Sequence, residues 1–199
     1  MEQPPKGRIK KDFVDMAYRV DMPKDFKVLF KAHALGVGES KNRSQRVTNL
    51  TVLFWDLNTY KQTLNMSNEE VEQQRLSKLK ERGAFDKATV QTSGAKSKLV
   101  RDRIPDLPYK ESGENYSYKT VGGDQRLERL DQKLLEECEE LMQAKDRNKK
   151  IEELADINEV LFAILKYRNI QMNEITPRLQ TLETIQVTEK RRKLKNFKN

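Results

Sequence analysis

The sequence predicts an all-α protein, a helical bundle whose amphipathic helices turn their apolar faces inward. Apolar residues recur at helical spacing along most of the chain, as in Leu130, Leu134, Cys138 and Leu141. Helix-start signals precede several of these segments, including Ser67 with Glu70 three residues later. The chain has no apolar run long enough to cross a membrane, so no membrane partner is expected.

The first part of the chain contains four expected helical segments. A first helix face runs through residues 9–20, and a second segment begins at Pro23 and is broken by Gly36 and Gly38. An apolar helix is expected over residues 45–61. Ser67 then caps a helix that should end at Gly83.

The second part begins after a small, polar stretch. Residues 91–97 have linker composition, and residues 98–123 contain prolines and glycines that predict a largely non-helical arm. Helices are expected at 124–145, 149–168 and 176–195, the last starting with Thr176 as N-cap and proline at the first helical position.

Composition excludes several kinds of site and suggests a compartment. The single cysteine cannot form an internal disulfide, and the polar, charged N-terminus carries no visible secretory signal, so a cytoplasmic protein is expected. With one histidine, His-based zinc sites and Ser–His or Cys–His catalysis are disfavoured. The net charge of +8 suits anionic partners such as nucleotides or nucleic acid.

Two acidic pairs are the most informative feature of the chain. Glu137 and Glu140 are three residues apart, as are Glu153 and Asp156, so each pair occupies one face of a helix. Two such helices packed together would gather four carboxylates, which need a cation to remain ionised in a small volume. Hard oxygen ligands favour Mg²⁺, or Mn²⁺. The alternative is that the pairs are ordinary surface charges of a charge-rich chain.

The same region resembles a known family. Lys98-Leu-Val-Arg-Asp-Arg-Ile-Pro105, then Glu136-Glu137-x-x-Glu140 and Glu153-x-x-Asp156, is similar to MazG-like, phosphoribosyl-ATP pyrophosphohydrolase-like proteins over about residues 98–170. The resemblance implies an all-α fold of the MazG-like type. It also implies Mg²⁺-dependent cleavage of a nucleoside triphosphate, or related nucleotide, to monophosphate and pyrophosphate. Glu137, Glu140, Glu153 and Asp156 would be the metal ligands, supported by Glu136 and Glu159.

One departure from the family suggests an internal duplication. The basic tail with glycines expected at the C-terminus is absent there, but a similar element occurs at residues 78–87. This predicts a tandem pseudo-dimer in one chain: residues 1–90 as a degenerate helical half, 91–97 as a linker, and 98–199 as the metal-binding catalytic half. Aligning the two halves without gaps places Gln45 opposite Glu153 and Thr48 opposite Asp156, so the first copy would lack the ligands.

The catalytic residues follow from what this reaction needs. A cation would lie at the carboxylates, and the attacking water would be either bound to the metal or oriented by a spare carboxylate such as Glu136. Because the chain has no P-loop, basic side chains must hold the phosphates. The candidates are Lys98, Arg101, Lys80 and Arg82.

Two other functional classes remain. A basic, helical nucleic-acid-binding or regulatory protein would use Arg43, Arg46 and the basic run 190–195, with Trp55 and Tyr60 for stacking. The second class is a catalytically silent protein that binds a nucleotide or a protein partner. The sequence leaves open the base and sugar of the substrate and whether two chains form a homo-oligomer.

Overall fold

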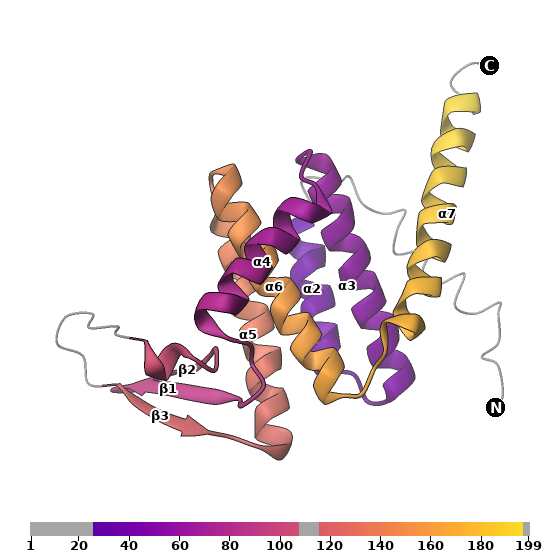
Figure 1. Cartoon of the computed structure of the whole chain (residues 1–199). Helices are drawn as coiled ribbons and strands as arrows, with labels where there is room; N and C mark the ends of the chain where they lie inside the picture. Colours follow the sequence, from indigo (N-terminus) through magenta and orange to yellow (C-terminus); the bar gives the residue numbers. More distant parts are fainter. Residues whose placement is uncertain (1–25, 108–115, 197–199) are drawn as a thin grey trace.

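Six helices and a small sheet make up the part of the chain that the computed structural model describes, residues 26–107 and 116–196 (Figure 1). The helix expected over residues 9–20 lies outside these ranges. The elements are α2 (Phe26–Gly38), α3 (Arg43–Thr63), α4 (Asn68–Arg82), β1 (Thr89–Ser93), β2 (Lys96–Val100), a 3-10 turn η1 (Ile104–Asp106), β3 (Ser117–Thr120), α5 (Gly123–Gln143), α6 (Arg147–Tyr167) and α7 (Met172–Asn196).

Helix α4 begins and ends where the sequence predicts. The Ser67 side chain accepts from the backbone N–H of Glu70, whose carboxylate accepts from the Ser67 N–H, a complete capping box. At the other end Gly83 has φ +77, a conformation that disfavours other residues. A Cβ there would also lie 3.0 Å from the side chain of Arg103.

Two helix boundaries differ from expectation. Helix α7 begins at Met172, a turn before Thr176, because the Glu174 carboxylate accepts from the N–H of Gln171 and caps an earlier start. Helix α2 continues through Gly36 to Gly38. Because Gly36 has no side chain, α3 can approach it closely. Asn49 Nδ2 donates to the Gly36 carbonyl at 2.6 Å and would lie 3.2 Å from a Cβ at this position.

The three-stranded sheet corrects the all-α prediction. Residues 91–97, expected to be a linker, form the end of β1, the turn and the start of β2 in a hairpin, with Gly94 at φ +56 in the turn. β3 pairs antiparallel with the other side of β1, giving the order β2-β1-β3. The strands are short and mostly polar, so alternation was hard to recognise, although Val90 and Leu99 are buried.

The helices share one hydrophobic core, which includes residues from α2, α3, α5 and α6. Within each part of the chain, α2 packs on α3 and α5 packs on α6, and α2 packs on α5 between them. The last helix of each part packs on a helix of the other part. α4 packs on α6, and α7 packs on α3 (Figure 1). The first part of the chain therefore folds against the second.

This reciprocal packing has a counterpart in the helix ends. The same number of residues separates three pairs with matching roles: the N-caps Asn42 and Asp146, the positive-φ residues Asn65 and Asn169, and the capping glutamates Glu70 and Glu174. The same spacing matches fully buried Leu50 with Leu154 and Leu57 with Leu161.

The spacing shifts the expected alignment by one helical turn. It places Asn49, rather than Gln45, opposite Glu153, and Val52, rather than Thr48, opposite Asp156. The register read from sequence alone was therefore displaced, because amphipathic helices match almost as well when they are slid by one turn.

No helix within residues 26–107 and 116–196 is both long and apolar enough to cross a membrane.

Candidate metal and nucleotide site

The acidic pairs come together where α5 packs on α6. Carboxylate oxygens of Glu137, Glu153 and Asp156 lie within 4.8 Å of one another. Glu137 and Glu153 are buried, with 4% and 1% of their surface exposed. Glu140 is exposed and outside this trio, but it lines the same cleft, and its charge helps raise the pKa of Glu153. The four expected ligand candidates thus share one site.

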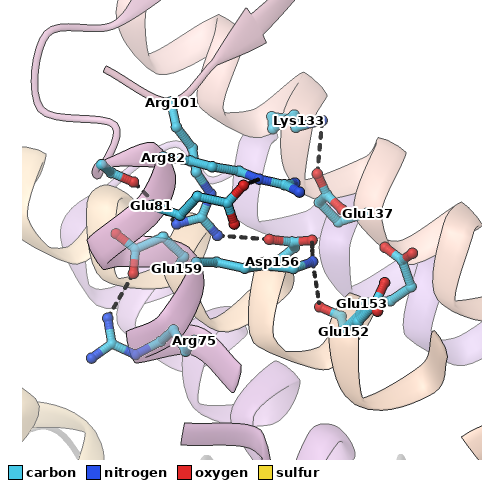
Figure 2. A network of polar contacts seen from close by, with 12 residues as sticks. Arg75, Glu81, Arg82, Arg101, Lys133, Glu137, Glu152, Glu153, Asp156 and Glu159 are labelled. Atoms are coloured by element: carbon cyan, nitrogen blue, oxygen red, sulfur yellow. Dashed lines mark hydrogen bonds and ion pairs between the residues drawn. The ribbon is translucent and has the colours of Figure 1, made fainter. Parts of the chain in front are cut away.

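Four basic side chains neutralise the carboxylates. Lys133 Nζ lies 2.7 Å from Glu137, and Lys149 Nζ lies 2.6 Å from Glu153. Asp156 is held by two cations from outside its own helix. Lys78 of α4 contacts Oδ2 at 2.5 Å. Arg101, just after β2, contacts Oδ1 at 2.6 Å (Figure 2).

Burial dominates the electrostatics of the two glutamates. Desolvation raises the pKa of Glu137 to about 7, partly opposed by Lys133 and reinforced by the charges of Asp156 and Glu153. Desolvation also raises the pKa of Glu153, against the attraction of Lys149. A nearby divalent cation would reverse this effect by favouring the ionised forms.

Unsatisfied oxygens point to what the cluster can hold. Glu137 Oε2 and Glu153 Oε2 are buried and accept no hydrogen bond from the described residues, whereas Glu153 Oε1 is paired with Lys149. Leaving buried carboxylate oxygens without donors is costly, so such atoms call for an explanation. An all-oxygen donor set fits a hard cation such as Mg²⁺ or Mn²⁺. Glu137, Glu153 and Asp156 are therefore suited to bind one, with Glu140 at the edge.

A cleft of about 500 Å³ opens above the carboxylates. Its floor is formed by α5 and α6, and its other walls by the C-terminal half of α4 and by the sheet. Because α4 belongs to the first part of the chain, the cleft exists only where the two parts meet. Its lining is predominantly polar and charged, as a phosphate-bearing ligand would require.

Three of the four expected phosphate-binding residues line this cleft: Arg82, Lys98 and Arg101. Arg101 is buried, donates to the Gly83 carbonyl, and lies over the Phe85 ring at 5.3 Å. Arg82 is drawn above Asp156 in Figure 2, and its Nε has no hydrogen-bond partner among the described residues. Lys80 is exposed and does not line the cleft, because it lies on another face of α4 from Lys78.

The two supporting glutamates are placed differently. Glu136 lines the cleft, and its Oε1 lies 3.0 Å from Lys133 Nζ, so it is a carboxylate beside the trio with access to solvent. Glu159 does not line the cleft. It is paired with Arg75 of α4 at 2.6 Å (Figure 2), which helps to hold α4 on α6.

The sequence contained signals for some residues that were overlooked. Lys133 precedes Glu136 and Glu137 by three and four residues, and Lys149 precedes Glu152 and Glu153 in the same way, so both pairings were readable from helical spacing. Lys78 had no local signal, because its partner Asp156 is distant in sequence.

Comparison with known proteins agrees with this site. Residues 106–182 match the family model described as Phosphoribosyl-ATP pyrophosphohydrolase, a segment that contains all four carboxylates. No match was found among curated proteins or solved structures. The resemblance expected from the acidic motifs is thus confirmed over residues 106–182, which match the family model of phosphoribosyl-ATP pyrophosphohydrolase.

Proposed function

We propose that the protein is a Mg²⁺-dependent nucleotide pyrophosphohydrolase, which cleaves a nucleoside triphosphate or related nucleotide to the monophosphate and pyrophosphate. One observation carries the proposal. Three carboxylates are clustered beneath a cleft lined by basic side chains, and two of them, Glu137 and Glu153, have a buried oxygen that accepts no hydrogen bond. The family match of residues 106–182 supports the same reaction class.

Glu137, Glu153 and Asp156 would hold the cation, with Glu140 as a fourth ligand. Mn²⁺ is an acceptable substitute for Mg²⁺ at such an oxygen site. The bound cation supplies positive charge to the phosphate oxygens and lowers the charge repulsion between the substrate and the acidic floor. Lys78 and Lys149 carry out this neutralisation when no divalent cation is bound.

The remaining residues of the cleft divide the other tasks. Arg82, Lys98 and Arg101 bind phosphate oxygens and compensate the charge that moves onto the leaving pyrophosphate. Glu136 orients a water and accepts its proton while the water oxygen bonds to the α-phosphorus. The bond from that phosphorus to the oxygen bridging the α- and β-phosphates then breaks, and pyrophosphate leaves.

The chain is organised as a tandem pseudo-dimer. Its degenerate half spans residues 1–90 and its catalytic half spans 98–199, with the hairpin across 91–97 joining them. The reciprocal packing of α4 on α6 and α7 on α3 supports a duplication, as do the equally spaced helix ends. A single chain then builds the whole cleft, so catalysis requires no second chain.

The first half has lost the ligands on this alignment. Gly36 lies opposite Glu140 and Asn49 lies opposite Glu153, and the Asn49 amide donates to the Gly36 carbonyl. The pairing of Lys78 with Asp156 corresponds to an apolar contact between Leu182 and Val52. Titration with Mn²⁺ should therefore give a stoichiometry of one binding site per chain, and Asn49→Ala should leave that stoichiometry unchanged.

The nucleic-acid alternative receives less support. Arg43 is bound to Glu174 and to two backbone carbonyls, and Arg46 is buried. Trp55 packs beside Val52 and Leu182. Arg46 and Trp55 are thus used in packing, and Arg43, although half-exposed, is engaged in contacts with the start of α7 and the turn before it. The side chains of the basic run 190–195 lie outside the described residues.

Isotope-labelled turnover tests the reaction directly. Nucleotides are incubated with Mg²⁺ in H₂¹⁸O, pyrophosphate is quantified, and the position of the label is read by mass spectrometry. Attack at the α-phosphorus puts ¹⁸O in the nucleoside monophosphate and none in pyrophosphate. Release of orthophosphate instead, or no turnover with Mg²⁺ or Mn²⁺ across standard and modified nucleotides, would refute the proposal. Glu153→Gln serves as the inactive control for contaminating phosphatases.

A further inference from the structure

One rung of the sheet places three different kinds of side chain side by side. Gln91 of β1 is the Cα partner of Lys98 on β2 and of Tyr118 on β3. Residues directly opposite one another on neighbouring strands project from the same face of a sheet. The central amide of the rung is therefore flanked by an ammonium group on one side and an aromatic ring on the other.

This face of the sheet is directed at the cleft. All three side chains of the rung line it. The neighbouring positions along the strands project from the opposite face, where Val90 and Leu99 are buried in the hydrophobic core. Since the apolar face is used for packing, the rung is the surface that the sheet offers to a ligand.

The chemistry of the rung differs from that of the rest of the cleft. The helical walls supply carboxylates and basic groups, which suit a cation and phosphates. Tyr118, with 39% of its surface exposed, offers an aromatic face. Gln91 is 9% exposed, and its Nε2 donates to Tyr118 Oη at 3.4 Å, while the amide carries a second N–H and a carbonyl oxygen.

We propose that the rung of Lys98, Gln91 and Tyr118 recognises the nucleoside part of the substrate. The Tyr118 ring stacks on the heterocyclic base, and the Gln91 amide hydrogen-bonds to the edge of the base. Lys98 lies on the opposite side of Gln91 and contacts a phosphate. The ligand class is a nucleoside polyphosphate with an intact base, in contrast to inorganic polyphosphate. This inference rests on the proposed function for the location of the phosphates.

The two base-binding residues make different contributions. Stacking on an aromatic side chain tolerates every base, because each base has a π-face. A side-chain amide distinguishes bases, because it matches only an edge with an adjacent donor and acceptor. Loss of the Tyr118 ring should therefore weaken all nucleotides alike, whereas loss of the Gln91 amide should reduce the difference between bases.

Binding measured without turnover tests the proposal. The probes are the non-hydrolysable α,β-methylene analogues of the four common ribonucleoside triphosphates, with inorganic tripolyphosphate as the base-free probe. Titration calorimetry of the full chain with Mg²⁺ should give tighter binding of at least one nucleotide than of tripolyphosphate. Tyr118→Leu should weaken the nucleotides about tenfold and leave tripolyphosphate unchanged. Tyr118→Phe keeps the ring and should retain the affinity.

Two further variants complete the design. Gln91→Leu preserves side-chain volume and should reduce the preference among the four bases without altering tripolyphosphate binding. Lys119→Ala is the matched control, because Lys119 is on the same strand as Tyr118 but projects from the other face and does not line the cleft. Circular dichroism confirms that each variant remains folded.

The outcomes separate this proposal from the proposed function. Equal loss of nucleotide and tripolyphosphate in Tyr118→Leu, or no nucleotide tighter than tripolyphosphate, would overturn base recognition even if pyrophosphate is released. Ring-dependent nucleotide binding without any pyrophosphate release would support the rung and refute the hydrolase. A Tyr118→Leu chain that fails to fold leaves Tyr118→Phe and Gln91→Leu to decide.

Discussion

Lys78 of α4 and Asp156 of α6 form a 2.5 Å ion pair that joins the two halves of the chain at the floor of the cleft. Both side chains are largely buried, at 7% and 17% exposure. The pair lies where a divalent cation would bind. The lysine therefore stabilises the protein without metal and competes with the metal for the same carboxylate.

Lys78→Met separates these two effects. Removing the ammonium leaves Asp156 with Arg101 alone, so unfolding of the metal-free protein should require about 1–3 kcal/mol less free energy. The same change should strengthen Mn²⁺ binding severalfold, because a competing positive charge is gone. Urea unfolding and Mn²⁺ titration followed by electron paramagnetic resonance measure the two quantities.

The control for this variant is Lys145→Met, which removes an exposed charge that does not line the cleft. Both quantities should stay at the wild-type value. Weaker Mn²⁺ binding in Lys78→Met would show that the lysine does not compete with the metal.

Glu153→Gln and Asp156→Asn should both abolish turnover but change stability in opposite directions. Repulsion within the acidic cluster, taken alone, would predict that neither change destabilises the metal-free protein. Lys149 lies 2.6 Å from Glu153 Oε1, but burial outweighs this attraction and raises the pKa of Glu153, so neutralising that charge should raise the melting temperature without metal. Asp156 is paired with both Lys78 and Arg101, so neutralising Asp156 should lower the melting temperature. Scanning calorimetry in EDTA measures the melting temperatures of both variants. Shifts in the same direction would contradict the view that burial dominates at Glu153 and ion pairing at Asp156.

Arg82→Ala should raise KM for the nucleotide by about tenfold and change kcat less, because a phosphate contact is lost from both ground and transition states. Its guanidinium lines the cleft and makes no buried ion pair, so the melting temperature should hardly change. Steady-state kinetics of pyrophosphate release give both constants. Lys87→Ala, a nearby exposed residue, is the control, and an unaltered KM in Arg82→Ala would remove this arginine from the site.

Asp131 gives the protein a pH dependence away from the metal site. Burial raises its pKa to about 6, although Arg46 and Arg168 attract the ionised form. The folded state thus holds a proton that the unfolded state releases near pH 4. Between about pH 4 and 6 the free energy of unfolding should fall as pH rises, by at most about 3 kcal/mol from this group.

Asp131→Asn mimics the protonated form and should remove that fall. The variant should be more stable than the wild type at pH 7.5 and similar to it at pH 4. Urea unfolding at the two pH values measures the difference. A variant less stable than the wild type at pH 7.5 would mean that attraction to the arginines outweighs burial.

Local sequence signals predicted the helices well, because caps and periodicity act within a few residues. Ser67, Glu70 and Gly83 bounded α4 correctly for this reason. The same signals gathered the four acids, since their spacing fixes them to helix faces. The sheet was missed because its three strands are short and polar, and pairing of β3 with β1 depends on residues far apart in sequence.

The basic residues of the site also divide into those that local sequence spacing predicts and those that only the tertiary fold brings in. Lys133 and Lys149 were implied by helical spacing to their partners, whereas Lys78 and Arg101 reach Asp156 only through the tertiary fold. Arg101 was nevertheless expected in the site from the resemblance of its motif. Lys80 was expected there on the same grounds, but its position on α4 turns it away.

The crossing of α4 onto α6 has a consequence for dissecting the gene. A fragment cut to residues 106–182 would carry every acidic ligand candidate, but it would lack Lys78, Arg82, Lys98 and Arg101. It would also uncover the surface of α6 on which α4 rests. The smallest piece that retains the whole cleft must therefore begin upstream of α4, and a search for similar proteins by the acidic segment alone would leave out the basic side chains that α4 and the sheet contribute.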